Sequence, residues 1–158
     1  MKNAALTAEG ALGLLLGHDG GGLCRRRILI CGFGRIGRLL APRLLAMGAR
    51  VGVAARSASD RAWAEAMGCA AMSLGEAAVP DWDFVVNTVP SPLFGGAEIA
   101  AFGEAKLVEL ASAPYGFDLA SAEALGKRVE LASGLPARCA PEAAAAAIRD
   151  TIYNMLEE

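Results

Sequence analysis

The sequence predicts a three-layer α/β/α fold, a doubly wound parallel sheet of about six strands with helices on both faces. Short apolar runs alternate along the chain with longer stretches rich in alanine and leucine, which is the pattern of successive β-α-β units. The length of 158 residues suits about one domain, and 54% hydrophobic against 20% charged residues suffices for a buried core. We expect an N-terminal helix and glycine-rich linker in residues 1–22 and the sheet domain in residues 23–158.

Each element is placed by its own local pattern. Thr7 is expected to cap a helix over residues 7–17, which the following glycines end. Ser59 is expected to cap a later helix, and Pro141 suits the first position of a last helix running to about residue 156. The strands are expected at residues 27–31, 51–55, 70–73, 83–87, 106–110 and 128–131. Further helices are expected at residues 35–47, 60–67 and 96–102.

Charge and cysteine usage exclude several classes of protein. Fifteen Lys and Arg residues against seventeen Asp and Glu residues leave a net charge of −2, without a broad basic field for nucleic acid or an anionic membrane. No apolar run approaches the ~18 residues that span a bilayer. The four cysteines are scattered, and the single histidine, His18, is expected in an exposed loop, so no metal site is predicted. We expect a cytoplasmic protein with reduced thiols that binds neither nucleic acid nor membrane.

A glycine motif between the first strand and the next helix predicts a dinucleotide site. The first glycine permits a tight turn, the second lets the backbone approach a pyrophosphate, and the third allows the helix to pack closely. An ordinary glycine-rich turn without a ligand is the alternative, and another nucleotide such as S-adenosylmethionine is a further one. The residues predicted to bind the cofactor here are Gly32, Phe33, Gly34, Arg35, Ile36 and Gly37.

The end of the second strand predicts which dinucleotide is bound. An NAD site usually places an acidic side chain there to accept from the ribose 2′-hydroxyl, but this chain has Arg56 and Ser57 and no carboxylate before Asp60. A guanidinium and a hydroxyl are donors suited to a 2′-phosphate, so NADP is predicted. Alternatively, Arg56 lies on a surface loop or stacks on adenine. Arg61 is either a second phosphate partner or an exposed helix residue.

The loops after the fourth and fifth strands are expected to border the nicotinamide, because ligands lie at the carboxyl ends of parallel strands. Thr88, Val89 and Pro90 follow one strand, and Ser112 follows the next. Proline and serine are also routine loop residues, so a purely structural role is the alternative. No catalytic triad or pair of carboxylates is visible, and the catalytic residues are unknown from pattern alone.

Taken together, several segments resemble the C-terminal, nucleotide-binding part of the dipicolinate synthase A family and, more distantly, the NAD-binding domain of D-2-hydroxyacid dehydrogenases. The match runs in order over nearly the whole chain. The opening Thr-Ala-Glu-Gly, the Asn-Thr-Val-Pro and the late Gly-Leu-Pro make it more specific than the glycine motif alone. The segments are residues 7–10, 32–37, 55–56, 87–90, 110–112, 134–136 and 140–141.

The resemblance implies an oxidoreductase of a spore-forming bacterium, which makes dipicolinate from a dihydrodipicolinate-pathway intermediate with NADP and a second, flavoprotein-like synthase component. Family members carry a further domain before the position of Thr7, so this chain alone is expected to be inactive. A non-catalytic dinucleotide-binding module for sensing or assembly is the alternative. Apolar residues in the first and last helices are expected to lie exposed and to favour a homo-oligomer.

The chain departs from the family pattern at positions near the expected substrate. Glu109 stands where the family usually has aspartate, and Tyr115 adds bulk where it has glycine. Arg138 replaces a lysine and keeps a cation that would pair with a carboxylate of a dicarboxylate substrate. Ser112 and Arg138 are therefore the candidates for catalytic or substrate-anchoring roles.

Overall fold

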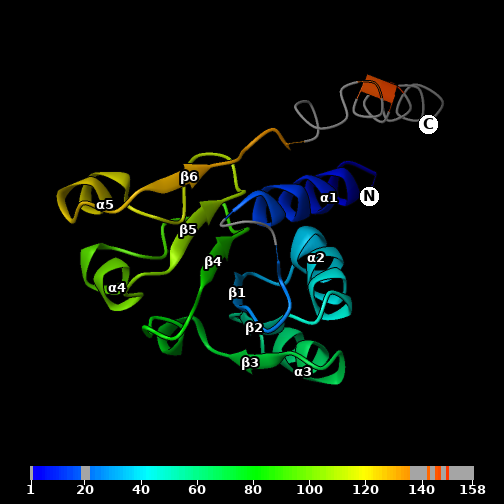
Figure 1. The fold of residues 1–158 in the computed structure, drawn as a ribbon, viewed down its shortest axis with the longest axis horizontal. Helices are drawn as coiled ribbons and strands as arrows, with labels where there is room; N and C mark the ends of the chain where they lie inside the picture. The colour runs from blue at the N-terminus through cyan, green and yellow to red at the C-terminus, as the bar shows by residue number, and fades with distance from the viewer. Residues whose placement is uncertain (1, 19–21, 136–141, 143–144, 147–148, 150–158) are drawn as a thin grey trace.

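The computed structural model describes residues 2–18, 22–135, 142, 145, 146 and 149. Its centre is a 6-stranded, all-parallel sheet with the order β3-β2-β1-β4-β5-β6 (Figure 1). The predicted fold class is confirmed, and the strands match the predicted ones with small shifts at their ends. The strands are β1 (Arg27–Cys31), β2 (Arg50–Ala54), β3 (Ala70–Met72), β4 (Phe84–Asn87), β5 (Lys106–Glu109) and β6 (Val129–Leu131).

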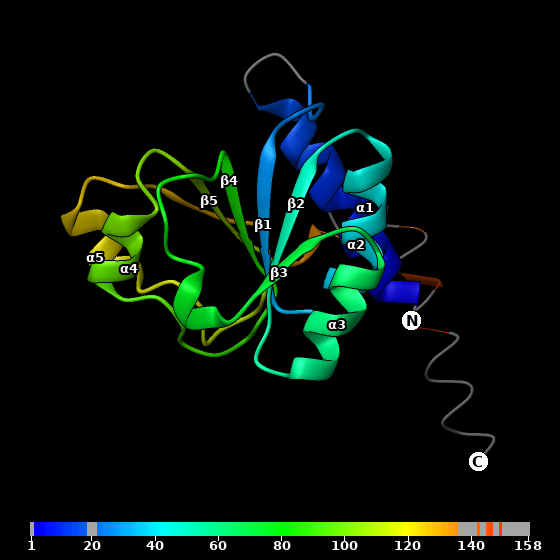
Figure 2. The ribbon, with the colours of Figure 1, turned by 90° about the horizontal axis from the view of Figure 1, so that it is seen from below.

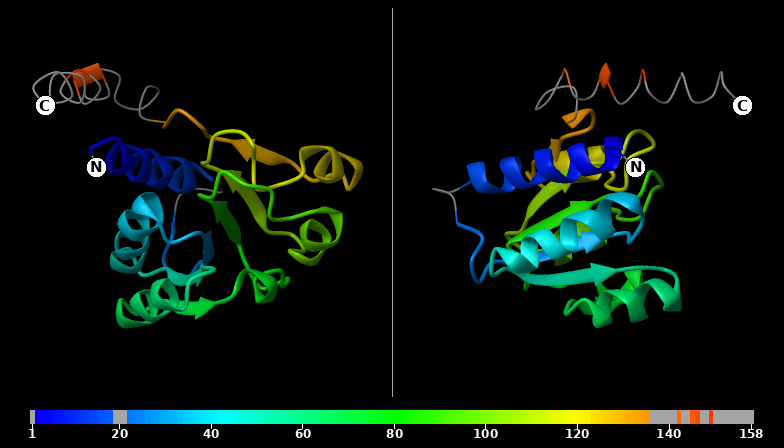
Figure 3. Two further views of the ribbon diagram at one scale, coloured as in Figure 1. Left: turned by 180° about the vertical axis from the view of Figure 1, so that it is seen from behind. Right: turned by 90° about the vertical axis from the view of Figure 1, so that its right-hand side faces the viewer.

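Helices cover both faces of this sheet. Three of them, α1, α2 and α3, lie on one side, and α4 and α5 lie on the other (Figures 1 and 2). In both views of Figure 3, α1 runs alongside α2. The helices are α1 (Lys2–Gly17), α2 (Arg35–Ala46), α3 (Ala58–Ala66), α4 (Gly96–Ala101) and α5 (Leu119–Ala124), with a single 3-10 turn at Leu74–Glu76.

Strand β1 shows how the sequence builds two cores at once. Its side chains alternate between the faces of the sheet, and all of the apolar ones are fully buried. Ile28 and Ile30 join the cluster under α1 and α2, whereas Leu29 and Cys31 join the cluster under α4 and α5. Burial on both faces explains why the strand reads as a continuous apolar run.

The first helix differs from its prediction at both its start and its exposure. It begins at Lys2, so Thr7 is not its cap; Thr7 lies inside the helix and its hydroxyl donates to the carbonyl of Asn3 at 2.8 Å. Ala8, Ala11 and Leu15 are buried in the core beneath it. The predicted exposure of this apolar segment is therefore wrong, because α2 and the sheet cover it.

Three other local predictions are corrected. Ser57, not Ser59, caps α3, since its hydroxyl accepts from the amide of Asp60. His18 is not in an exposed loop position: its Nε2 lies 2.8 Å from Glu130 Oε2 and its ring lies against Phe84. Helix α5 has no counterpart among the predicted helices. Of the helix expected after Pro141, the structure describes residues 142, 145, 146 and 149, which are helical, and the rest lies outside the described residues.

The described cysteines form no disulfide. Cys31 and Cys69 are buried, and burial raises the pKa of both thiols. Cys24 is exposed in the loop before β1, where it lies against Gly48. Among the described residues, no helix is both long and apolar enough to cross a membrane.

Candidate functional site

The strand order places a cleft above the centre of the sheet. The chain crosses from one side of β1 to the other between β3 and β4, and ligands of open α/β sheets bind at the carboxyl ends of the strands beside such a switch point. The last residues of four strands lie in register there, Ala54 beside Cys31, Cys31 beside Asn87 and Asn87 beside Glu109. A cavity of about 980 Å³ lies over this row.

The predicted cofactor residues are brought together by this cavity. The glycine loop, the end of β2 and the loops after β4 and β5 all contribute to its wall. Of the predicted site residues within the described part of the chain, every one but Gly37 lines it. Arg138 lies outside the described residues. Sequence reasoning missed the contribution of α1, which adds Asn3, Ala4 and Thr7.

The three glycines of the motif have different surroundings. Gly32 has φ +97°, and a Cβ there would lie 2.5 Å from the side chain of Val89. At Gly37 an added Cβ would lie 2.3 Å from the carbonyl oxygen of Gly32, so a side chain cannot fit between helix and strand. At Gly34, by contrast, an added Cβ would meet no protein atom within 4 Å. The fold itself therefore does not demand glycine at position 34.

The amino end of α2 carries free donors into the cavity. Gly34 is its N-cap and supplies no side-chain hydrogen bond to the first turn. Arg35 and Ile36 of that turn line the cavity, and helix amides at these positions have no partner within the helix. With the helix dipole, they form a place suited to an anion such as a pyrophosphate.

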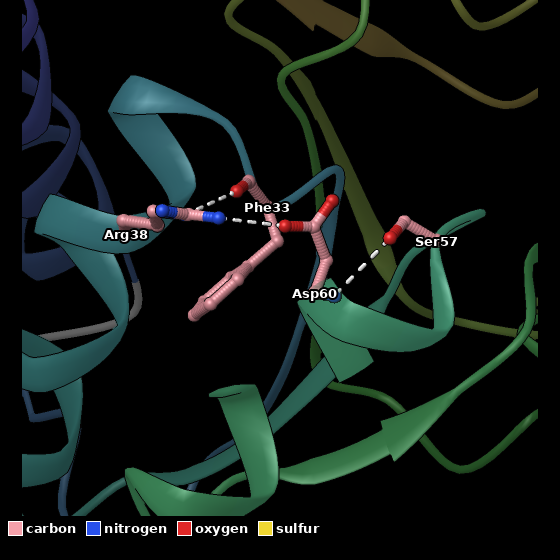
Figure 4. Close-up of polar contacts among 4 residues, drawn as sticks. All are labelled: Phe33, Arg38, Ser57 and Asp60. Atoms are coloured by element: carbon pink, nitrogen blue, oxygen red, sulfur yellow. Dashed lines mark hydrogen bonds and ion pairs between the residues drawn. The ribbon is translucent and has the colours of Figure 1, made fainter. Parts of the chain in front are cut away.

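The residues that follow β2 include one uncommitted cation, Arg56, and one paired carboxylate, Asp60 in the first turn of α3; Figure 4 shows the Asp60 pair. The Arg56 side chain is exposed and makes no hydrogen bond or ion pair with any described residue. Asp60 also lines the cavity, and its Oδ1 accepts from Arg38 Nη2 at 2.7 Å. Arg61 donates to the carbonyls of Ala55 and Arg56 at 2.8 Å each, so its guanidinium braces the backbone of the strand end.

The loop after β4 is fixed by hydrogen bonds to the end of β1 and to Asn87. The Thr88 hydroxyl donates to the carbonyl of Cys31 at 2.9 Å, which leaves its oxygen available to a ligand as an acceptor. Val89 donates its amide to Asn87 Oδ1 at 3.1 Å, and Asn87 Nδ2 donates back to the Val89 carbonyl at 2.9 Å. Pro90 and the exposed Ser112 complete this part of the wall.

A buried carboxylate holds the next loop. Glu109 is 0% exposed, and it accepts from Asn87 Nδ2 at 2.7 Å and from the amides of Ala111 and Gly116 at 3.0 and 2.8 Å. Burial raises the pKa of this carboxyl, and the hydrogen bonds oppose the shift. Gly116 packs against Asn87, since an added Cβ would lie 2.3 Å from its Nδ2. The network fixes the loop that carries Ser112.

The chemistry of the described site is that of binding and positioning. Amides, the guanidinium groups of Arg35 and Arg56 and hydroxyl groups line the cavity, while Asp60 is the one carboxylate among the lining side chains that the structure describes. In the same part of the chain, no group of three or more His, Cys, Asp and Glu residues is placed to hold a metal ion. These groups suit a bound cofactor that brings its own reactivity.

Comparison with known proteins agrees with this geometry. Residues 16–93 match the family model described as D-isomer specific 2-hydroxyacid dehydrogenase, NAD binding domain. Dipicolinate synthase A of Bacillus subtilis (strain 168) is 31% identical over 159 residues, an alignment that covers 99% of this chain and 54% of that protein. The chain thus spans about half the length of this curated relative.

Solved structures show the same relationship. Dipicolinate synthase A from Bacillus subtilis superposes with a TM-score of 0.91 at 30% identity, covering 99% of this chain and 53% of that one. The same protein from Bacillus halodurans superposes with a TM-score of 0.89 at 28% identity, and the match covers 100% of this chain and 57% of that one. Glutamyl-tRNA reductase from Methanopyrus kandleri superposes with a TM-score of 0.68 at 18% identity, and the match covers 93% of this chain and 39% of that one. At this identity the likeness shows the fold alone.

Proposed function

Because the chain is a homologue of dipicolinate synthase A along 99% of its length, we propose that it is the NADP-binding domain of an oxidoreductase of that kind. The observation that carries the proposal is Gly34. A Cβ at this position would meet no protein atom within 4 Å, so the protein itself does not require glycine here. The missing side chain leaves the backbone open toward the cavity. A ligand that approaches the main chain closely explains a glycine at this position.

Each part of the cavity then has a partner in the cofactor. The amides of Arg35 and Ile36 receive the pyrophosphate, and Arg56 with Ser57 receives the 2′-phosphate. Thr88 and Val89 hold the nicotinamide end, where the hydroxyl oxygen of Thr88 accepts from the carboxamide. When bound, the nicotinamide supplies the hydride chemistry, and the protein supplies orientation.

The substrate in this proposal is a cyclic dicarboxylate. Arg138 pairs with one of its carboxylates, and Ser112 on the cavity wall offers it a hydroxyl. Hydride transfer requires the reacting atoms to be held about 3–3.5 Å apart and shielded from water. The cavity supplies the cofactor side of such an enclosure. The remaining wall is assigned to the part of the relatives that this chain does not span.

Calorimetric titration with NADPH and NADH tests the cofactor assignment. NADPH is expected to bind more tightly, and Arg56→Asp is expected to shift the preference toward NADH. Arg50→Asp, which removes an exposed arginine at the opposite end of β2, is the matched control and should leave both affinities unchanged. Equal or reversed affinities for the two cofactors in the unaltered protein would contradict the assignment to NADP.

A further inference from the structure

Four residues beside the proposed ribose end of the cavity form one cluster (Figure 4). Arg38, in the first half of α2, donates from Nη2 to Asp60 Oδ1 at 2.7 Å and from Nε to the carbonyl of Phe33 at 3.0 Å. Its guanidinium lies 5.6 Å from the centre of the Phe33 ring. Ser57 accepts from the amide of Asp60 at 3.4 Å. The cluster ties the glycine loop to the start of α3.

The position of Asp60 poses an electrostatic problem for a 2′-phosphate. Asp60 lines the same cavity as Arg56 and Ser57, and its side chain is 30% exposed. A carboxylate beside the ribose favours a 2′-hydroxyl, because it accepts from that group and repels a phosphate. Left unpaired, Asp60 would therefore work against the donors at Arg56 and Ser57.

Arg38 is the cation placed to remove this conflict. Among the described residues, the ion pair that Asp60 makes is the one with Arg38. Arg61, the next residue along α3, directs its Nη1 to the carbonyls of Ala55 and Arg56. Arg38 itself does not line the cavity, so it acts on a ligand through Asp60 and the glycine loop.

We propose that Arg38 is a positioning residue that sets the cofactor preference of this site, by pairing Asp60 so that its negative charge is compensated beside a 2′-phosphate. The inference rests on the proposed dinucleotide site and deepens it. Loss of Arg38 would expose one negative charge next to the 2′-phosphate. A solvent-screened charge pair at a protein surface changes an affinity several-fold, up to about tenfold.

The test measures affinities for NADPH and NADH in a double-mutant cycle of Arg38→Met and Asp60→Asn. Methionine keeps an unbranched side chain over the Phe33 ring. Arg38→Met is expected to weaken NADPH binding about tenfold while NADH binding holds or improves. In the Asp60→Asn background the same substitution should change the NADPH affinity by less than about twofold. Arg43→Met is the control, because it removes a cation from the same helix that pairs with Glu9 and not with Asp60.

Other outcomes separate the possible failures. If Arg38→Met lowers the affinities for NADPH and NADH equally, Arg38 only holds the glycine loop in place, and the proposal is overturned. If Arg38→Met weakens NADPH binding just as much in the Asp60→Asn background, Arg38 does not act through Asp60. If Arg38→Met does not fold, Asp60→Asn alone decides: the proposal requires NADPH binding as tight as in the unaltered protein or tighter. No binding of either cofactor by the unaltered protein would instead refute the proposed function.

Discussion

Gly34 and Gly37 belong to one turn but are expected to respond to substitution in opposite ways. Gly34→Ala should fold normally, because the added methyl group meets no protein atom within 4 Å, yet it should weaken dinucleotide binding by obstructing the backbone. Gly37→Ala forces a contact at 2.3 Å with the carbonyl of Gly32 and should lower the free energy of unfolding by about 1–3 kcal/mol. Urea unfolding and calorimetric titration measure the two effects. A destabilised Gly34→Ala protein with unchanged affinity would contradict this division.

Glu109 is expected to give the protein a specific pH dependence. Burial raises the pKa of its carboxyl in the folded state. A raised pKa favours folding while the group stays protonated, and that contribution is lost as pH rises through the folded-state pKa. The free energy of unfolding of the unaltered protein minus that of Glu109→Gln should therefore fall as pH rises above the ordinary titration range of glutamate, and then level off.

Urea unfolding at a series of pH values measures this difference. Glu123→Gln, an exposed carboxyl on α5, controls for the loss of one negative charge. A difference that grows with pH would show that the hydrogen bonds from Asn87, Ala111 and Gly116 outweigh the cost of burying the charge.

Residue types alone locate part of the site but not its electrostatics. The glycine spacing and the absence of an early carboxylate after β2 are visible in the sequence. The pairing of Arg38 with Asp60 is not, because it depends on where the first turns of α2 and α3 lie relative to each other in the fold. In the sequence, a carboxylate a few residues after a strand looks like any exposed acidic residue until the start of the next helix is known. The sequence pattern predicts the helix cap at Ser59, whereas the structure has it at Ser57.

At the scale of elements, Trp82 covers strand β2 at a position that requires glycine. An added Cβ at Gly52 would lie 2.3 Å from Cη2 of the Trp82 ring, whose Nε1 donates to the carbonyl of Ala77 at 3.1 Å. Gly52→Ala should therefore cost about 1–3 kcal/mol of stability. The cost should shrink in a Trp82→Phe background, where the outer ring is absent. Urea unfolding of the four proteins measures it, and identical costs in both backgrounds would contradict direct packing.

The strands are predictable because burial on both faces leaves continuous apolar runs between turn residues. The helices are less so. The start of α1 is misplaced because threonine is a common cap, whereas here its hydroxyl bonds back to Asn3 inside the helix. Helix α5 is only Leu119–Ala124, too short for a periodic pattern, and Asp118 caps it by accepting from the amides of Ala120 and Ser121.

At the scale of the whole molecule, we expect cofactor binding without appreciable turnover by this chain. The reason is that one wall does not exclude water from a hydride transfer, and precise alignment contributes roughly 7–11 kcal/mol to lowering a barrier. NADPH absorbance, followed with the enzymatically generated dihydrodipicolinate-pathway intermediate, measures turnover. A protein of the relatives' full length should be active and should lose activity in Arg138→Ala.

Robust turnover by the chain alone would contradict the expectation that this chain binds the cofactor without catalysing the reaction. Cofactor binding without turnover in the longer protein as well would favour a non-catalytic sensing or assembly module. Association with a second copy, or with a second synthase component, stays a prediction, which light scattering after size exclusion measures.

The exposed thiol of Cys24 offers a practical route to these measurements. It lies in the loop that leads into β1, whereas the cavity lies beyond the other end of that strand. Cys31 and Cys69 are buried, with thiol pKa values raised by burial, so both should react slowly with maleimides. With Cys139 replaced by serine, a fluorophore or surface linker attached at Cys24 would anchor the protein by the end remote from its ligand.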